Sequence, residues 1–195
     1  YDSAGNVVKS NYYDAKELPT TCKEGGYASY QSVYTDGNWT ESRYFDAQGN
    51  LMLRKDSGYA IITLQYDEFG QRISEFYYDT DNQPVISSKF QCAGNVSEFD
   101  QLGNNTDIRY LSPDGSLMVR RDYGYAHEHR EYALLGNKIK ESYYDSKEHP
   151  VTCKEGGFAS YENKYENGKC METRYYDTQG NLTLHNEYGY AVRKL

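Results

Sequence analysis

Residues 58–79 read GYAIITLQYDEFGQRISEFYYD. Alternate residues from Ala60 to Tyr66 are apolar or aromatic, which is typical of a strand with one buried face, and a second strand-like run follows from Arg72 to Tyr78. The intervening Asp67-Glu68-Phe69-Gly70 suits a loop built on a type I turn with glycine in the left-handed conformation. This stretch therefore predicts a β-hairpin.

The hairpin pattern repeats along the whole chain. A doublet that begins with tyrosine returns every 32 or 33 residues, at Tyr12-Tyr13, Tyr44-Phe45, Tyr77-Tyr78, Tyr110-Leu111, Tyr143-Tyr144 and Tyr175-Tyr176. Fifteen residues after each doublet begins stands an aromatic residue, or Cys92 in one unit, and alanine always follows it. Such a period means that each unit is one supersecondary element that buries its apolar face only against its neighbours.

Variation between the units falls where a hairpin array tolerates it. In the two units of 32 residues the second turn is shortened to Asp36-Gly37 or Asn167-Gly168, pairs that suit a two-residue type I′ hairpin. Units with proline after the doublet (Pro19, Pro84, Pro150) alternate with units that carry Gly-Asn-Leu or Gly-Ser-Leu there. Two unit types in alternation indicate three copies of a longer module of about 65 residues.

The high tyrosine content indicates that the chain is folded and not disordered. Leu, Ile, Val and Phe together make up only 32 of 195 residues, and with a net charge of −8 this level would normally indicate disorder. The 23 tyrosines change that conclusion, because a tyrosine ring buries apolar area while its hydroxyl stays hydrogen-bonded. We therefore predict an all-β fold, an elongated array of antiparallel β-hairpins that is either solenoid-like or an open curved sheet.

We expect a single tandem-repeat array over residues 1–195, with six repeat starts. The expected boundaries are a partial unit at 1–11, units at 12–43, 44–76, 77–109, 110–142 and 143–174, and a partial unit at 175–195. The partial units suggest a piece of a longer polypeptide, so flanking repeats or domains of that chain are expected partners.

Charge and cysteine placement exclude several classes of function. Acidic and basic residues are interleaved, which argues against a nucleic-acid partner, and no apolar run long enough for membrane insertion is present. Nothing in the sequence calls for a cofactor. The four cysteines, Cys22, Cys92, Cys153 and Cys170, form no disulfide framework and are expected to be small buried or half-buried thiols.

One departure from the repeat and one recurring set of carboxylates are candidates for chemical sites. His127 and His129 should lie on one face of a strand and could hold a metal, but no third ligand is indicated, so exposed strand residues are the favoured interpretation and no metal site is predicted. The aspartates that follow five of the doublets are expected to accept hydrogen bonds from their own turns, at Asp14, Asp46, Asp79, Asp145 and Asp177. Because a catalytic carboxylate would not need to recur in five units, these groups are interpreted as structural, and the chain is expected not to be an enzyme.

Aromatic rings are the remaining candidates for binding. The first tyrosine of each doublet should face the core, and the second residue must point to the other side of the strand. Rings on that other side offer a stacking surface for sugars or a partner protein. The candidate ligand-binding residues are Trp39, which is the only tryptophan and lies beside a hairpin tip, and Tyr13, Tyr78, Tyr144 and Tyr176.

Several turn sequences resemble the YD repeats of bacterial surface and secreted proteins of the RHS type, namely YDSAGNV (1–7), FDAQGNL (45–51), YDEFGQR (66–72) and YDTQGNL (176–182). The aromatic hairpin motif is more loosely similar to choline-binding and glucan-binding wall proteins. These resemblances imply an extracellular or bacterial cell-surface location. They imply a non-catalytic repeat module that binds a glycan or protein through exposed tyrosine rows or acts as a spacer. The alternative is a shell or scaffold segment that encloses or presents an adjacent enzyme or toxin domain.

Overall fold

The computed structural model describes all residues from Tyr1 to Leu195. Its regular elements are β-strands, and it contains no helix long and apolar enough to cross a membrane. The strands are β1 (Lys9–Asn11), β2 (Ser29–Thr35), β3 (Asn38–Phe45), β4 (Ile61–Tyr66), β5 (Arg72–Tyr78), β6 (Gly94–Phe99), β7 (Asn105–Leu111), β8 (His127–Tyr132), β9 (Lys138–Tyr144), β10 (Ser160–Glu166), β11 (Lys169–Tyr176) and β12 (Val192–Lys194). The predicted all-β array of antiparallel hairpins is confirmed.

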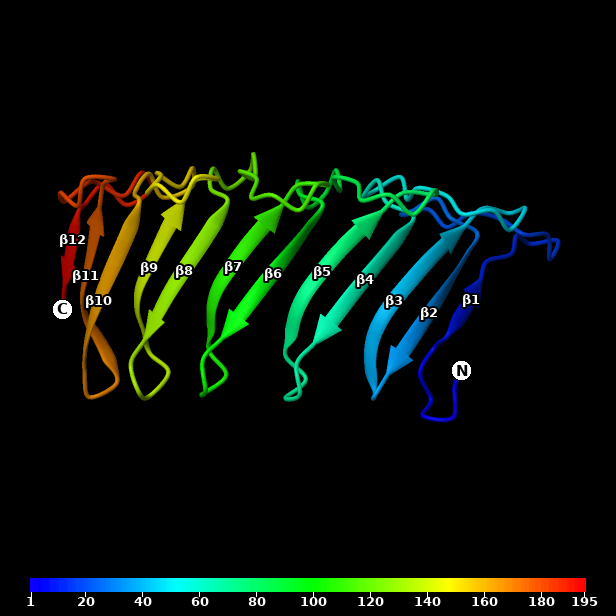
Figure 1. Ribbon diagram of the computed structural model, residues 1–195, viewed down its shortest axis with the longest axis horizontal. Coiled ribbons are helices and arrows are strands. Elements are labelled where there is room, and N and C mark those ends of the chain that lie inside the picture. The colour runs from blue at the N-terminus through cyan, green and yellow to red at the C-terminus, as the bar shows by residue number, and fades with distance from the viewer. The chain divides into compact units, whose positions relative to one another are not determined.

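The chain divides into two compact units, the first made of residues 1–95 with 112–114 and the second of residues 96–111 with 115–195. In the first unit β1 to β5 pair antiparallel in chain order. In the second unit β7 to β12 do the same. Within each unit the hairpin tips lie together on one side, and the segments that join successive hairpins gather at the other ends of the strands (Figure 1).

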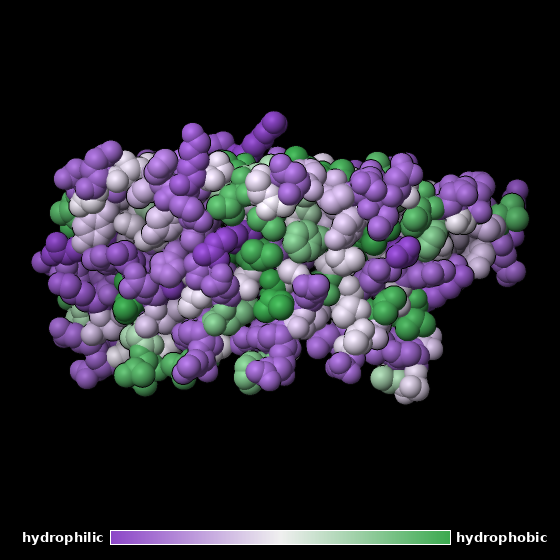
Figure 2. Space-filling view, viewed as in Figure 1, coloured by the Kyte–Doolittle hydropathy of each residue, from purple (hydrophilic) through white to green (hydrophobic).

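The hairpin tips have the turns that the sequence predicts. Asp36 and Gly37 have φ values of 52° and 81°, and Asn167 and Gly168 have 50° and 75°, so both residues of each pair are left-handed as a type I′ turn requires. At the longer tip, Gly70 has a φ of 78°. Large apolar side chains stand exposed at several tips, and Phe69 and Leu134 are 79% and 90% exposed. On the face seen in Figure 2 hydrophilic residues predominate, and apolar residues form small groups.

The aspartates after the doublets hold the second set of turns, as predicted. In each case one carboxylate oxygen accepts hydrogen bonds from the backbone N–H groups two and four residues further on, at Asp14, Asp46, Asp79, Asp145 and Asp177. These bonds lower the pKa of Asp46, chiefly through the N–H of Asn50. The turns are therefore locally determined features of the repeat.

The invariant alanine lies where one repeat joins the next. The N–H of Tyr110 donates to the carbonyl of Ala126 at 2.8 Å, and the N–H of Ala126 donates to the carbonyl of Tyr144 in the following repeat, also at 2.8 Å. Ala60 is placed in the same way between Tyr44 and Tyr78. Both alanines are 0% exposed. A small side chain is therefore required at this position.

Tyrosine rings supply the core on one face of the strands. The first tyrosine of the doublet is 6% exposed at Tyr44, 1% at Tyr77 and 7% at Tyr143. Tyr77 stacks between Tyr59 and Phe90, with ring centroids 5.0 and 5.2 Å away. We call this face, on which the first tyrosines lie, the ladder face. The predicted core role of these rings is confirmed, and Cys92 and Cys153 are buried thiols beside them.

Candidate functional site

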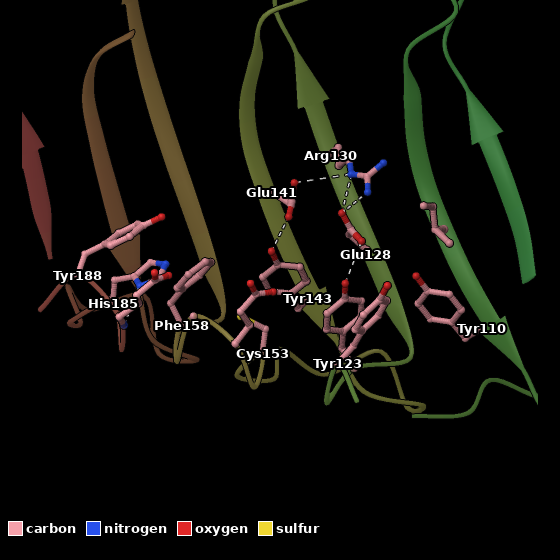
Figure 3. A pocket seen from close by; sticks show the side chains of 15 residues that line it. Tyr110, Tyr123, Glu128, Arg130, Glu141, Tyr143, Cys153, Phe158, His185 and Tyr188 are labelled. Atoms are coloured by element: carbon pink, nitrogen blue, oxygen red, sulfur yellow. Dashed lines mark hydrogen bonds and ion pairs between the residues drawn. The ribbon is translucent and has the colours of Figure 1, made fainter. Parts of the chain in front are cut away.

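The candidate site lies in the second unit, where the ladder face forms a hollow of about 470 Å³. Aromatic rings make up its walls, and Glu128, Arg130 and Glu141 lie among them (Figure 3). Tyr123, Tyr125 and Tyr143 form one set of stacked rings. The ring centroid of Tyr125 lies 5.4 Å from that of Tyr123 and 4.5 Å from that of Tyr143. We call this hollow the tyrosine groove.

Strand geometry explains why polar groups lie at this place. Glu128 and Arg130 are two residues apart on β8, so both point to the ladder face, and Glu141 of β9 lies opposite Arg130 in the strand register. The positions that correspond to Arg130 and Glu141 in other repeats are also paired. They hold Leu64 and Glu75 in the first unit, and Asn163 and Thr173 further along the second. The groove is therefore built from repeat positions whose residue type changes from unit to unit.

A hydrogen-bond network fixes the two carboxylates. The Tyr125 hydroxyl donates to Glu128 Oε2 at 3.0 Å, and Arg130 Nε donates to Glu128 Oε1 at 2.6 Å. Glu141 accepts from Lys138, from the Tyr143 hydroxyl and, at 3.2 Å, from the Tyr161 hydroxyl. All four carboxylate oxygens have a donor, so the pair holds the wall of the groove together.

The two carboxyl groups have pKa values that are shifted in opposite directions. Burial and the negative charge of Glu141 raise the pKa of Glu128 above its usual 4.5. The pKa of Glu141 is lowered: burial opposes this, but the hydrogen bonds from Lys138 and Tyr143 and the nearby positive charges outweigh it. Glu128 is therefore the member of the pair that holds its proton to higher pH.

We expect Glu128→Gln and Glu141→Gln to change stability with opposite dependence on pH. The folded state binds more protons at Glu128 than the unfolded chain does from pH 4.5 upward to its raised pKa, so this group costs stability as pH rises through that window. The thermal midpoint of Glu128→Gln, compared with that of the parent protein, should therefore increase as pH rises from 4 to 7.

Glu141 contributes stability that is present above pH 4.5 and lost as pH falls through its lowered pKa. The loss caused by Glu141→Gln, about 2 kcal/mol at pH 7, should therefore shrink in acid. Thermal melts of the three proteins at pH 3, 4, 5 and 7, followed by circular dichroism, measure these differences. Parallel pH profiles for the two variants would contradict the assignment.

The rim of the groove is open. Tyr123 is 39% exposed and Tyr188 is 53% exposed, and the carboxylates of Glu155 and Glu187 are exposed. Tyr188 stacks on His185 with a centroid distance of 4.1 Å, and it also lines a second hollow of about 490 Å³ that includes Tyr161, Tyr190 and Arg193. The exposed ring of Tyr188 thus lies between two adjacent hollows.

The candidate residues named from the sequence lie outside this groove. Trp39 is half-buried, and its indole N–H donates to the carbonyl of Glu41 at 2.9 Å and to Ser42 Oγ at 2.8 Å. Tyr13 is 58% exposed, whereas Tyr78, Tyr144 and Tyr176 are half-buried. Each of these four tyrosines forms an isolated β-bridge to the Pro or Leu that ends its turn. The structure does not bring the five residues together, and their role in ligand binding stays a prediction.

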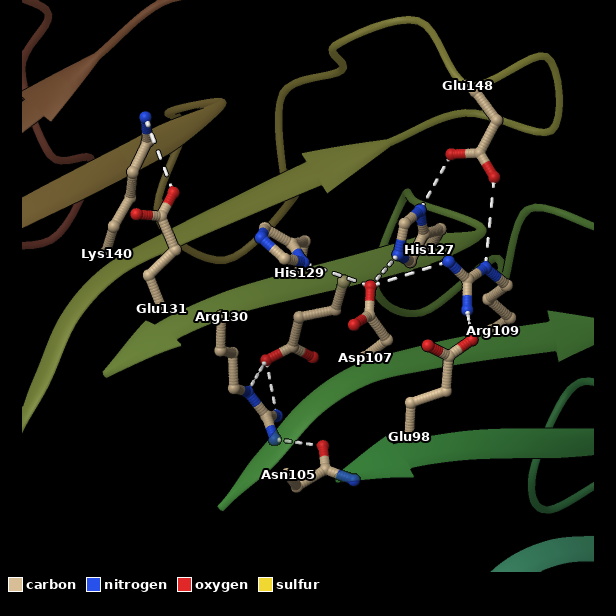
Figure 4. Close-up of polar contacts among 11 residues, drawn as sticks. Glu98, Asn105, Asp107, Arg109, His127, His129, Arg130, Glu131, Lys140 and Glu148 are labelled. Atoms are coloured by element: carbon tan, nitrogen blue, oxygen red, sulfur yellow. Dashed lines mark hydrogen bonds and ion pairs between the residues drawn. The ribbon is translucent and has the colours of Figure 1, made fainter. Parts of the chain in front are cut away.

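A second polar cluster lies on the opposite face of β7 and β8 (Figure 4). His127 and His129 share this face, as predicted. One ring nitrogen of each lies close to Asp107 Oδ1: His127 Nε2 at 2.9 Å and His129 Nδ1 at 3.0 Å. The expectation that both histidines are exposed strand residues is wrong for His127, which is 6% exposed because Tyr144 stacks on its ring and Glu148 covers its Nδ1. The sequence reasoning also missed Asp107, which the β7–β8 register places opposite His129.

Comparison with known proteins found no matching family model and no matching curated protein. Among solved structures the chain is similar to the crystal structure of TcdB2-TccC3-Cdc42, with 14% identity, a TM-score of 0.39 and coverage of 94% of this chain. It is similar at the same identity and coverage to TcdB2-TccC3 without its hypervariable C-terminal region, with a TM-score of 0.41. The chain spans 10% of the length of each of these structures. At these values the similarity assigns no function to the chain.

Proposed function

We propose that this chain is a non-catalytic repeat module of an extracellular or bacterial cell-surface protein, and that its tyrosine groove binds a glycan. The observation that carries the proposal is the groove itself, a hollow with aromatic walls and exposed carboxylates at its rim. Aromatic rings contact the C–H faces of sugars, and a few fixed polar groups among apolar walls orient a small ligand. The YD-like turns of the sequence support the location.

The charge of the groove narrows the ligand class. Its lining residues include the acidic Glu128, Glu141, Glu155 and Glu187, against one arginine, Arg130. Close like charges repel strongly where water is partly excluded, so an acidic sugar is disfavoured. Neutral and amino-substituted glycans are the ligands that fit, with Glu155 and Glu187 free to accept hydrogen bonds from hydroxyl or ammonium groups.

A binding role fits the network better than a catalytic one. General acid–base catalysis needs a carboxyl group within hydrogen-bond reach of the reacting proton. Glu128 and Glu141 instead have their oxygens occupied by Arg130, Lys138 and three tyrosine hydroxyls. These two groups therefore serve to hold the rings in place.

We expect Tyr188→Ala to weaken glycan binding about tenfold or more, because the exposed ring that lies between the two hollows is removed. Tyr1→Ala is the matched control, since Tyr1 is an exposed tyrosine, 86% accessible, and lies outside the groove. A glycan array followed by calorimetric titration with the best neutral or amino glycan measures the effect. Binding of uronic or sialic acid glycans only, or equal affinity of the Tyr188 variant, would contradict the proposal. A protein ligand captured at the groove without any glycan would contradict it as well.

A further inference from the structure

We propose that Asp107, His127 and His129 form a binding site for a divalent transition-metal ion, with zinc as the favoured ion. The site is independent of the tyrosine groove, because the three residues lie on the other face of β7 and β8. Imidazole nitrogen together with a carboxylate oxygen is a ligand set that suits zinc. The prospective ligand atoms of all three residues lie within 4.8 Å of one another.

The geometry converges on one point. His127 Nε2 and His129 Nδ1 lie 2.9 and 3.0 Å from the same oxygen, Asp107 Oδ1. Ligand atoms bound to one tetrahedral zinc ion are about 3.3 Å apart, given bond lengths near 2.0 Å. Only a small outward movement would admit the ion. His129 is free to make it, since its side chain is 37% exposed.

Glu148 acts as the outer partner of His127. Its Oε2 lies 2.7 Å from His127 Nδ1, on the side of the ring away from Asp107. A carboxylate that accepts a hydrogen bond from the N–H of one ring nitrogen leaves the other nitrogen with its lone pair free for a metal, and metal-ligating histidines commonly have such a partner. The ring of Tyr144, with its centroid 5.2 Å from that of His127, further fixes the orientation of the imidazole.

The charge balance also favours a cation. Three carboxylates, Glu98, Asp107 and Glu148, surround one guanidinium, Arg109, which pairs with Glu98 at 2.5 Å and lies 3.5 Å from Asp107 and 4.0 Å from Glu148. With neutral histidines the cluster carries a charge of −3 + 1 = −2, which a divalent ion neutralises. The ion would also join β7 to β8, and thus two successive hairpins.

Titration of the whole chain with Zn²⁺ and with Co²⁺ tests the site. The parent protein is expected to bind one equivalent, to give the visible absorption bands of tetrahedral Co²⁺, and to gain thermal midpoint on binding. Glu148→Gln should weaken binding about 10- to 100-fold. Asp107→Asn and His129→Asn should weaken it further, because each removes a ligand.

His149→Ala is the matched control, since His149 is 71% exposed and contacts only Asp145 among the ion pairs. This variant should bind metal like the parent. Circular dichroism of each variant establishes that it is folded. If a variant that lacks a ligand does not fold, Glu148→Gln still tests the site, because it keeps all three ligands. Absence of Zn²⁺ and Co²⁺ binding by the parent would overturn the proposal, and so would binding that His149→Ala abolishes or that Asp107→Asn and His129→Asn leave unchanged.

Discussion

Replacing Tyr77 with alanine is expected to lower the free energy of unfolding by about 4 kcal/mol. Tyr77 is 1% exposed, and its ring stacks on Tyr59 and Phe90 at interplanar angles of 24° and 7°. Removing the ring loses its buried apolar area, leaves a cavity and ends two aromatic contacts, and these losses act together. Urea unfolding followed by circular dichroism measures the change.

Two controls separate the ring from other effects. Tyr77→Phe keeps the ring and loses the hydroxyl that donates to Glu75, so it should cost only about 1 to 2 kcal/mol. Tyr13→Ala, at a position that is 58% exposed, should change the free energy of unfolding by less than about 0.5 kcal/mol. If Tyr77→Ala and Tyr13→Ala had equal effects, the ladder face would not be the core.

Ala126→Leu is expected to destabilise the protein by about 3 kcal/mol, the upper end of the usual cost of overpacking a buried position. Ala126 is 0% exposed, and its backbone is hydrogen-bonded to Tyr110 on one side and to Tyr144 on the other. A larger side chain has no space in a close-packed position, so the two backbone hydrogen bonds that join successive repeats would be strained.

The matched control for this change is Ala15→Leu, at an exposed turn position, which should be close to neutral. Ala126→Gly tests size from the other direction and should cost only about 1 kcal/mol, mainly through backbone entropy. Thermal midpoints of the three variants decide the matter. A tolerated leucine at position 126 would show that the invariant alanine is not fixed by space.

Much of the fold follows from local signals in the sequence. The turn at Asp36-Gly37, the left-handed Gly70 and the capping aspartates are each specified within a few residues, so period and turn chemistry together predict the hairpins. The burial of Tyr77 follows from strand alternation once the core face is known. In these cases local preference and tertiary structure agree.

The candidate sites were harder to predict, because each depends on contacts between separate repeats. Asp107 lies 20 residues before His127, and only the register of β7 against β8 shows that they meet. The same register recurs where Glu41 pairs with Thr63, so aligning the repeats before searching for ligands would have found Asp107. Glu128 gives a similar signal, because the equivalent position in the first unit holds Ile62. Glu141 gives no such signal, since the equivalent position there holds Glu75.

Surface exposure of single rings was the least predictable property. Tyr144 packs on His127, and the hydroxyl of Tyr176 donates to Glu162 at 3.2 Å, which are contacts that the repeat pattern does not predict. Trp39 has its indole N–H bonded within its own strand. Strand alternation predicts which side of the sheet a residue faces. Whether its ring is exposed there depends on the neighbouring side chains.

Amide hydrogen exchange, read residue by residue with NMR, tests the central claim that successive hairpins are stabilised by the bonds between them. The account predicts that the slowest amides recur with the period of the sequence, at first tyrosines such as Tyr44 and Tyr143 and at alanines such as Ala60 and Ala159, whose N–H groups donate across the junctions between repeats. Tip residues such as Gly37 and Gly70 should exchange fast. Uniform fast exchange at the junctions, or protection without that period, would contradict the account.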